Sequence, residues 1–132
     1  VPQGLAFYSG SVSYHQKIRP ILSEGERLFV RIPDYRGVAV QVRVNGISAG
    51  IAAWEPNEVD ITERVTGNEL DLSIEVISHR RNSHGPLHLH EKWPHWSGPD
   101  QFAYKPDKWT DGYQLVPCGP MKPPELIIRK PR

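Results

Sequence analysis

Apolar and polar residues alternate with a period of two along much of the first 76 residues, which is the pattern of half-buried β-strands. The clearest run covers residues 38–44, where four valines alternate with Ala39, Gln41 and Arg43. Asn45-Gly46 follows, and both residues tolerate the positive φ of a two-residue hairpin turn. The pattern therefore predicts an antiparallel hairpin near the middle of the chain.

Further alternating runs predict strands over residues 8–18, 28–32, 70–76 and 113–116. Short strands are also expected over residues 47–54, which contain Gly50, and over the apolar run 126–128. Asp60 is expected to cap a short helical turn over residues 61–65, with Glu63 at capping-box spacing. The 13 prolines and 11 glycines favour short strands joined by turns over long helices. We expect an all-β fold, an antiparallel β-sandwich of jelly-roll type, with a barrel as the less favoured closure.

Composition narrows the class of protein. With 132 residues the chain is long enough for one domain, which we place over residues 1–132. A net charge of +1 gives no strong field to attract nucleic acid or an anionic membrane, and no apolar run reaches the length of a membrane span. Cys118 is the only cysteine, which excludes an intrachain disulfide. Because the sequence begins with Val1 rather than Met, we expect a domain excised from a longer chain.

The motifs around the hairpin carry a family resemblance. Val-Asn-Gly at 44–46 is followed by Trp-Glu-Pro at 54–56, Asp-Ile-Thr at 60–62 and Gly-Asn-Glu-Leu at 67–70. In this order and spacing the chain resembles the sugar-binding domain of glycoside hydrolase family 2, a galactose-binding-like jelly roll. Residues 78–88, with Arg-Arg-Asn at 80–82 and Gly-Pro-Leu-His at 85–88, look like the version found at the C-terminus of large bacterial enzymes.

The resemblance implies a non-catalytic accessory domain of a bacterial glycoside hydrolase, whose catalytic carboxylates sit on a separate barrel. A (β/α)8 barrel needs about 250 residues and does not fit in this chain. The expected partners are carbohydrate, the catalytic domain of the parent chain, or both. The family setting favours a secreted or periplasmic protein. It also allows a structural calcium held by loop carboxylates, although the sequence gives no position for one; we predict no other cofactor and no metal site.

Between residues 78 and 112 the periodicity disappears, and long irregular segments in compact domains are usually functional or disordered. Arg81, Asn82 and His88 are the polar candidates for carbohydrate binding, since their side chains can donate to or accept from sugar hydroxyls. Alternatively, these side chains could form hydrogen bonds with the backbone of the long loop. We favour this structural role over sugar binding, because such a loop has many backbone groups to satisfy.

Tryptophans in the same segment are candidates for stacking on a pyranose ring. We expect Trp93 and Trp96 on the contact surface, and Trp54 and Trp109 packed against the protein. Exposed aromatic rings could equally mark an interface with another domain. Three functions therefore stay open: a carbohydrate-binding accessory domain, a purely structural domain between others, and a loop that completes the active site of a parent enzyme.

Overall fold

The computed structural model describes residues 4–91 and 97–131. By its contacts the chain divides into two compact units. The sandwich unit comprises Ser11–Ser78 and Cys118–Arg132, and the loop unit comprises Val1–Gly10 and His79–Pro117. The prediction that residues 1–132 form a single domain stays a prediction.

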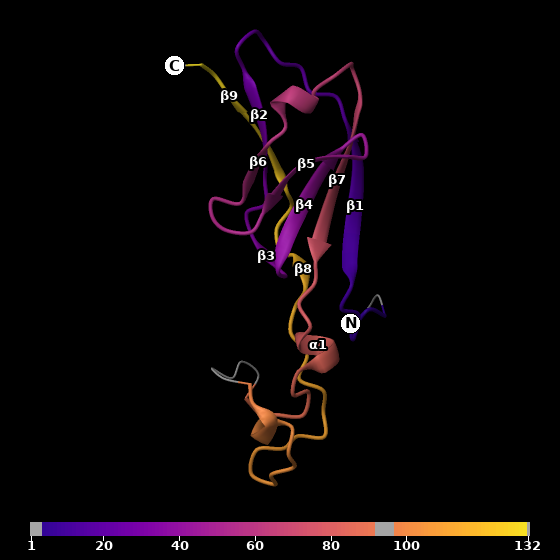
Figure 1. Cartoon of the computed structure of the whole chain (residues 1–132), viewed down its shortest axis with the longest axis vertical. Helices are drawn as coiled ribbons and strands as arrows, with labels where there is room; N and C mark the ends of the chain where they lie inside the picture. Colours follow the sequence, from indigo (N-terminus) through magenta and orange to yellow (C-terminus); the bar gives the residue numbers. More distant parts are fainter. Residues whose placement is uncertain (1–3, 92–96, 132) are drawn as a thin grey trace. The chain divides into compact units, whose positions relative to one another are not determined.

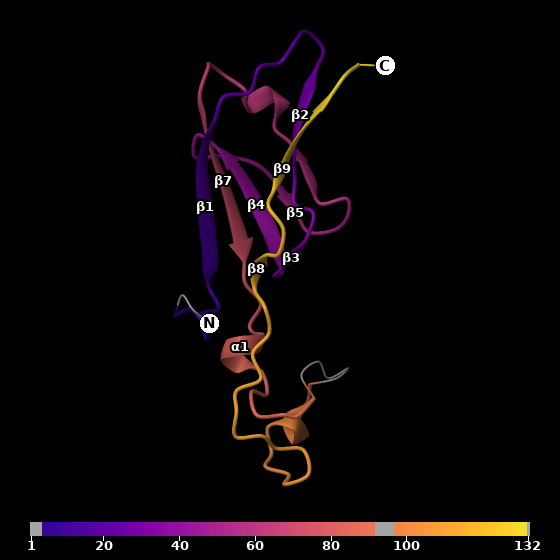
Figure 2. The same cartoon turned by 180° about the vertical axis from the view of Figure 1, so that it is seen from behind.

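The sandwich unit is built from antiparallel β-sheets (Figure 1). The larger sheet has the strand order β1-β7-β4-β5, the smaller sheet has the order β6-β2-β9, and β3 pairs with β8. Figure 2 shows β9 beside β2 from the opposite side. The strands are β1 (Ser11–Ile18), β2 (Arg27–Arg31), β3 (Tyr35–Arg36), β4 (Ala39–Val44), β5 (Ile47–Ala52), β6 (Glu58–Asp60), β7 (Leu70–Ile77), β8 (Gly119–Pro120) and β9 (Glu125–Arg129).

One apolar core lies between the two sheets. Alternate residues of β2, β4 and β7 point into it, and Val30, Val40, Val42 and Leu70 are fully buried. Period-two alternation requires this arrangement, because successive side chains of a strand point to opposite faces of the sheet. The predicted antiparallel β-sandwich is therefore confirmed, while the jelly-roll and galactose-binding-like assignments stay predictions.

The central hairpin forms as predicted. Asn45 has a φ of 51° and Gly46 a φ of 78°, which are the positive values of a type I′ turn. The Asn45 side chain also accepts a hydrogen bond of 2.9 Å from the backbone N–H of Asp71. The valine pattern differs at one position, since Val38 precedes β4 and its side chain is 63% exposed.

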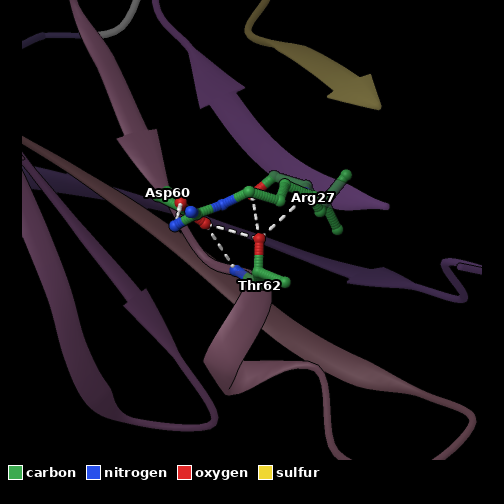
Figure 3. Close-up of polar contacts among 4 residues, drawn as sticks. Arg27, Asp60 and Thr62 are labelled. Atoms are coloured by element: carbon green, nitrogen blue, oxygen red, sulfur yellow. Dashed lines mark hydrogen bonds and ion pairs between the residues drawn. The ribbon is translucent and has the colours of Figure 1, made fainter. Parts of the chain in front are cut away.

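The Asp-Ile-Thr motif joins the edge strand β6 to the central strand β2 of the smaller sheet (Figure 3). The Thr62 hydroxyl donates to the Asp60 carboxylate and accepts a hydrogen bond of 2.9 Å from the backbone N–H of Leu28. Asp60 also accepts from the backbone N–H of Thr62 at 3.0 Å and pairs with Arg27. The N-cap of the helical turn is Ile61, without a side-chain cap, so the predicted capping by Asp60 and Glu63 is wrong. Burial works to raise the pKa of Asp60, but the hydrogen bonds from Thr62 and the contact with Arg27 outweigh it and lower that pKa.

Three local predictions need correction, and three short strands were not predicted. The first strand begins at Ser11 rather than residue 8, because the chain folds back before it and the Tyr8 ring covers Gly10. The helical turn η1 is limited to Thr62–Arg64. Residues 113–116 form no strand. The strands β3, β6 and β8 are only two or three residues long, which is too short for an alternating pattern to be recognised in the sequence.

Candidate functional site

The loop unit holds most of the predicted site residues, and few of its backbone groups pair in regular elements. Its described part contains the helix α1 (Arg81–His84), the short helix η2 (Pro99–Gln101) and an isolated bridge between Leu89 and Trp109. Around that bridge, the N–H of His90 donates to the Lys108 carbonyl at 2.9 Å, and the N–H of Thr110 donates to the His88 carbonyl at 2.8 Å. These bonds hold residues 87–90 and 108–114 together as two adjacent chain segments.

Two side chains tie the start of the loop segment to its end, and we refer to them as the clamp. Asn82 is 7% exposed; its amide nitrogen donates to the Val116 carbonyl at 2.8 Å, and its amide oxygen accepts from the Val116 N–H at 2.9 Å. His79 Nε2 lies 3.0 Å from the Pro117 carbonyl, which can only accept, so Nε2 carries the proton. The structure thus gives Asn82 a loop-holding role, and its contact with carbohydrate stays a prediction.

His88 is part of an aromatic cluster. Its ring stacks on Trp109 with centroids 4.5 Å apart and an interplanar angle of 16°, and it lies 5.0 Å from Tyr113. Two further rings complete the cluster: Phe7 packs edge-on against Tyr113, and Tyr104 packs edge-on against Trp109. His88 Nδ1 donates to the Thr110 carbonyl at 3.0 Å, which leaves Nε2 as an acceptor in the neutral ring.

The structure bears differently on the two tryptophans expected to be packed. Trp109 is partly buried in the aromatic cluster, as expected. Trp54, in the sandwich unit, is 82% exposed, so the expectation for this residue is wrong. It begins the turn after β5, where the Asn57 N–H bonds back to the Trp54 carbonyl at 3.0 Å and no neighbouring strand covers the indole. Trp93 and Trp96 lie outside the described residues.

Arg81 has an unusual environment. Its three guanidinium nitrogens are buried, and within residues 4–91 and 97–131 none has a hydrogen-bond partner. Burial lowers the pKa of this guanidinium, because a charged group is less stable away from water. Gly85 makes room for the side chain, since a Cβ at that position would collide with Arg81. Arg80, by contrast, is exposed.

A cavity of about 210 Å³ lies within the loop unit. Its walls combine one indole with acidic, basic and amide side chains, and none of Arg81, Asn82 and His88 lines it directly. His88 does not line the cavity, but its ring stacks on Trp109, which does. The lining residues are Leu89, His90, Glu91, Asp100, Gln101, Ala103, Lys105, Asp107, Lys108 and Trp109. The two lysines were missed from the sequence, since nothing in an aperiodic segment indicates which charged side chains share a cavity.

A second hollow, a groove of about 570 Å³, lies within the sandwich unit between β1 and the segment leading into β9. Leu126 and Ile128 are paired with the buried residues Val30 and Leu28, so they face the core side of the smaller sheet. They nevertheless remain 45% and 47% exposed. The sandwich core is therefore open along this margin.

Two further properties concern metals and membranes. Across residues 4–91 and 97–131, no group of three or more His, Cys, Asp or Glu side chains is placed to hold a metal ion. The predicted structural calcium has no position in the structure and stays a prediction. No helix in the described part of the chain is long and apolar enough to cross a membrane.

Two solved structures resemble the chain over most of its length. The rhamnosidase from Novosphingobium sp. PP1Y is 27% identical, with a TM-score of 0.65 over 93% of this chain. The FMN-binding beta-glucuronidase from Facaelibacterium prausnitzii L2-6 is 19% identical, with a TM-score of 0.55 over 91% of this chain. Both neighbours are glycoside hydrolases. At 19% identity the second likeness shows the fold alone.

The chain spans 11% of the rhamnosidase and 16% of the beta-glucuronidase. In each enzyme it therefore corresponds to one small part of a much longer chain. No protein-family model matches the sequence, and no curated protein matches it. The comparisons agree with the glycoside hydrolase setting that the sequence motifs predict, whereas membership of family 2 stays a prediction.

Proposed function

We propose that this chain is a non-catalytic accessory domain of a glycoside hydrolase and that its loop unit contacts carbohydrate. The observation that carries the proposal is the match to the rhamnosidase, which covers 93% of this chain and only 11% of the enzyme. A domain that recurs as a small part of a large hydrolase is suited to supporting or targeting a catalytic domain located elsewhere.

The residues of the chain support a non-catalytic role. Hydrolysis of a glycosidic bond uses two carboxyl groups about 5–9 Å apart on either side of the scissile bond. The carboxylates with clearly lowered pKa values, Glu58, Asp60, Glu69 and Glu75, are all engaged with arginine, lysine or hydroxyl partners in the sandwich unit. A catalytic acid has a raised pKa instead. These four groups therefore serve structure.

The aromatic cluster of the loop unit supports contact with carbohydrate. Sugar rings have apolar C–H faces that pack on flat aromatic side chains, and their hydroxyls bond to nearby charged or amide groups. Trp109 lies where both kinds of group meet, beside the carboxylates and lysines of the cavity.

The proposal is tested with the purified chain and a panel of oligosaccharides. Intrinsic tryptophan fluorescence is expected to change in a saturable manner with at least one of them, and no aryl glycoside is expected to be hydrolysed. The control is Trp54→Phe, which removes the exposed indole of the sandwich unit and should leave the response intact. Hydrolysis by the purified chain would overturn the non-catalytic assignment, and silence across the panel would overturn the carbohydrate contact.

The open margin of the sandwich supports a second function, packing against another domain of the same enzyme. The groove is lined by apolar side chains that face the core side, including Ile18, Ile74 and Leu126. Within a longer enzyme, Leu126→Lys is expected to separate the thermal transition of this domain from that of its neighbour. Ile21→Lys, at an 89% exposed position outside the groove, is the control. A single unchanged transition in both variants would contradict packing at this surface.

A further inference from the structure

We propose that the cavity of the loop unit binds a single pyranose residue without an acidic group, such as the end of a neutral glycan. This inference rests on the proposed carbohydrate contact and specifies its site, its size and its charge preference. Three observations carry it: the volume of the cavity, the way Trp109 is held, and the balance of charges on the walls.

The volume fits one sugar ring. An engineered protein cavity of about 150 Å³ takes up benzene, a six-membered ring without substituents. The cavity here, about 210 Å³, has room for a six-membered ring together with its hydroxyl groups. Pockets for larger ligands span about 300–1,000 Å³. The volume therefore favours one residue over a stretch of oligosaccharide.

The indole of Trp109 is held rigidly. His88 stacks on one of its faces, Tyr104 meets it edge-on with centroids 5.4 Å apart, and its Nε1 donates to Asp111 at 3.1 Å. His88 covers one face and Asp111 engages the N–H, while Trp109 also forms part of the cavity wall, so the part of the ring that lines the cavity is the surface for the C–H face of a sugar. A ring held in advance loses little conformational freedom when a ligand binds. Trp109 is thus the stacking surface of the site.

The polar walls can bond to hydroxyl groups. Asp100 is paired with Lys105 at 3.5 Å. All three of Glu91, Asp107 and Lys108 line the cavity, and their side chains have no hydrogen bond or ion pair with another residue of the described ranges. A carboxylate can accept from two neighbouring hydroxyls, and a lysine amine can donate to a hydroxyl or ring oxygen.

Charge decides which sugars the cavity accepts. Three carboxylates and two lysines line it, so the walls carry a negative excess. A uronic acid or a sulfated sugar would bring a further negative charge beside these carboxylates, and like charges repel. Neutral pyranoses avoid that penalty. We therefore expect neutral sugars to bind more tightly than acidic sugars of the same shape.

The experiment is a titration followed by ¹⁵N NMR, using methyl pyranosides of rhamnose, glucose and galactose, and glucuronate as the acidic probe. A neutral pyranoside is expected to shift the indole N–H of Trp109 and the amides of residues 89–91 and 100–109. The dissociation constant should be about 1 mM, as expected for a ligand with so few atoms. Glucuronate should bind at least threefold more weakly.

Two isosteric variants keep the test independent of folding. Glu91→Gln and Asp107→Asn change exposed side chains, so the fold should remain intact, and each should weaken binding about tenfold, the scale of one hydrogen bond to a charged group. Trp54→Phe should bind as the unchanged protein does. Trp109→Phe adds a variant that shortens the stacking surface.

The outcomes separate this site from the broader proposal. Shifts in the loop unit away from the cavity walls would overturn the cavity as the site and leave the proposed carbohydrate contact of the loop unit in place. A complete lack of shifts with every sugar, together with silence in the oligosaccharide panel, would overturn both. Equal affinity for glucuronate would overturn the charge preference, and unchanged affinity in both isosteric variants would overturn the assigned polar contacts.

Discussion

The sandwich unit and the loop unit are stabilised in different ways. In the sandwich, alternate residues such as Val40, Val42 and Leu70 bury their side chains between paired strands, and backbone ladders satisfy the peptide groups. In the loop unit, side chains such as Asn82 and His88 bond to backbone carbonyls, and aromatic rings stack on one another. The first kind of order repeats along the sequence, whereas the second depends on individual pairs of residues.

The largest effect is expected in the sandwich core. Ile61 is fully buried, so Ile61→Ala removes apolar contacts and leaves a cavity, at a cost of about 3 kcal/mol in the free energy of unfolding. Urea denaturation measures this loss. The control is Ile51→Ala, at a position 61% exposed, where the change should stay under about 0.5 kcal/mol. Equal losses in the two variants would contradict the description of the core.

A smaller and local effect is expected at the clamp. Asn82→Ala removes both hydrogen bonds to Val116 and leaves two buried backbone groups unpaired, which costs about 2 kcal/mol. Hydrogen exchange should speed up in residues 79–117 while β7 keeps its protection. Asn68→Ala, at an exposed turn of the sandwich unit, should leave both regions unchanged. Uniform acceleration across both units would show that they unfold together.

The smallest effect concerns pH. Hydrogen bonds from Arg31, opposed by burial and aided by Arg129, hold the pKa of Glu58 below its usual value. A lowered folded-state pKa contributes stability that is present above the unfolded value of about 4.3 and is lost as the pH falls through the folded value. We expect about 1 kcal/mol of stability to disappear in acid because both arginines are partly exposed.

Thermal unfolding from pH 7 down to pH 3 measures this loss, and Glu58→Gln supplies the comparison. The variant should be less stable than the unchanged protein at neutral pH and should lose less stability on acidification. The same acid dependence in both proteins would assign it to other carboxylates, such as Asp60.

The contrast between the units also explains what the sequence predicts well. The strands β2, β4 and β7 follow from period-two alternation, and the turn at Asn45-Gly46 follows from residues that accept positive φ. The short strands β3, β6 and β8 are set by pairing with distant segments, which leaves no local signal. Sequence reasoning therefore recovered the sandwich and missed its smallest strands.

Only part of the candidate site could be predicted from the sequence. The sequence singled out the aperiodic segment, and Trp109 and His88 meet within it, while its role in binding stays a prediction. The predicted residues Arg81 and Asn82 lie away from the cavity walls, because their polar groups are buried in the loop unit. Lys105 and Lys108 reach the cavity through contacts between residues that are far apart in the chain and unrelated in pattern.

The clamp has a consequence for how such a domain can vary. Asn82 and Val116 are 34 residues apart, so their two hydrogen bonds close the inserted segment into a loop between β7 and β8. The entropy lost on closing a loop rises slowly with length, by about 0.6 kcal/mol for each doubling. The sandwich can therefore carry insertions of very different length and surface chemistry at this point, as long as Asn82 is retained and the residue at 116 keeps its backbone N–H.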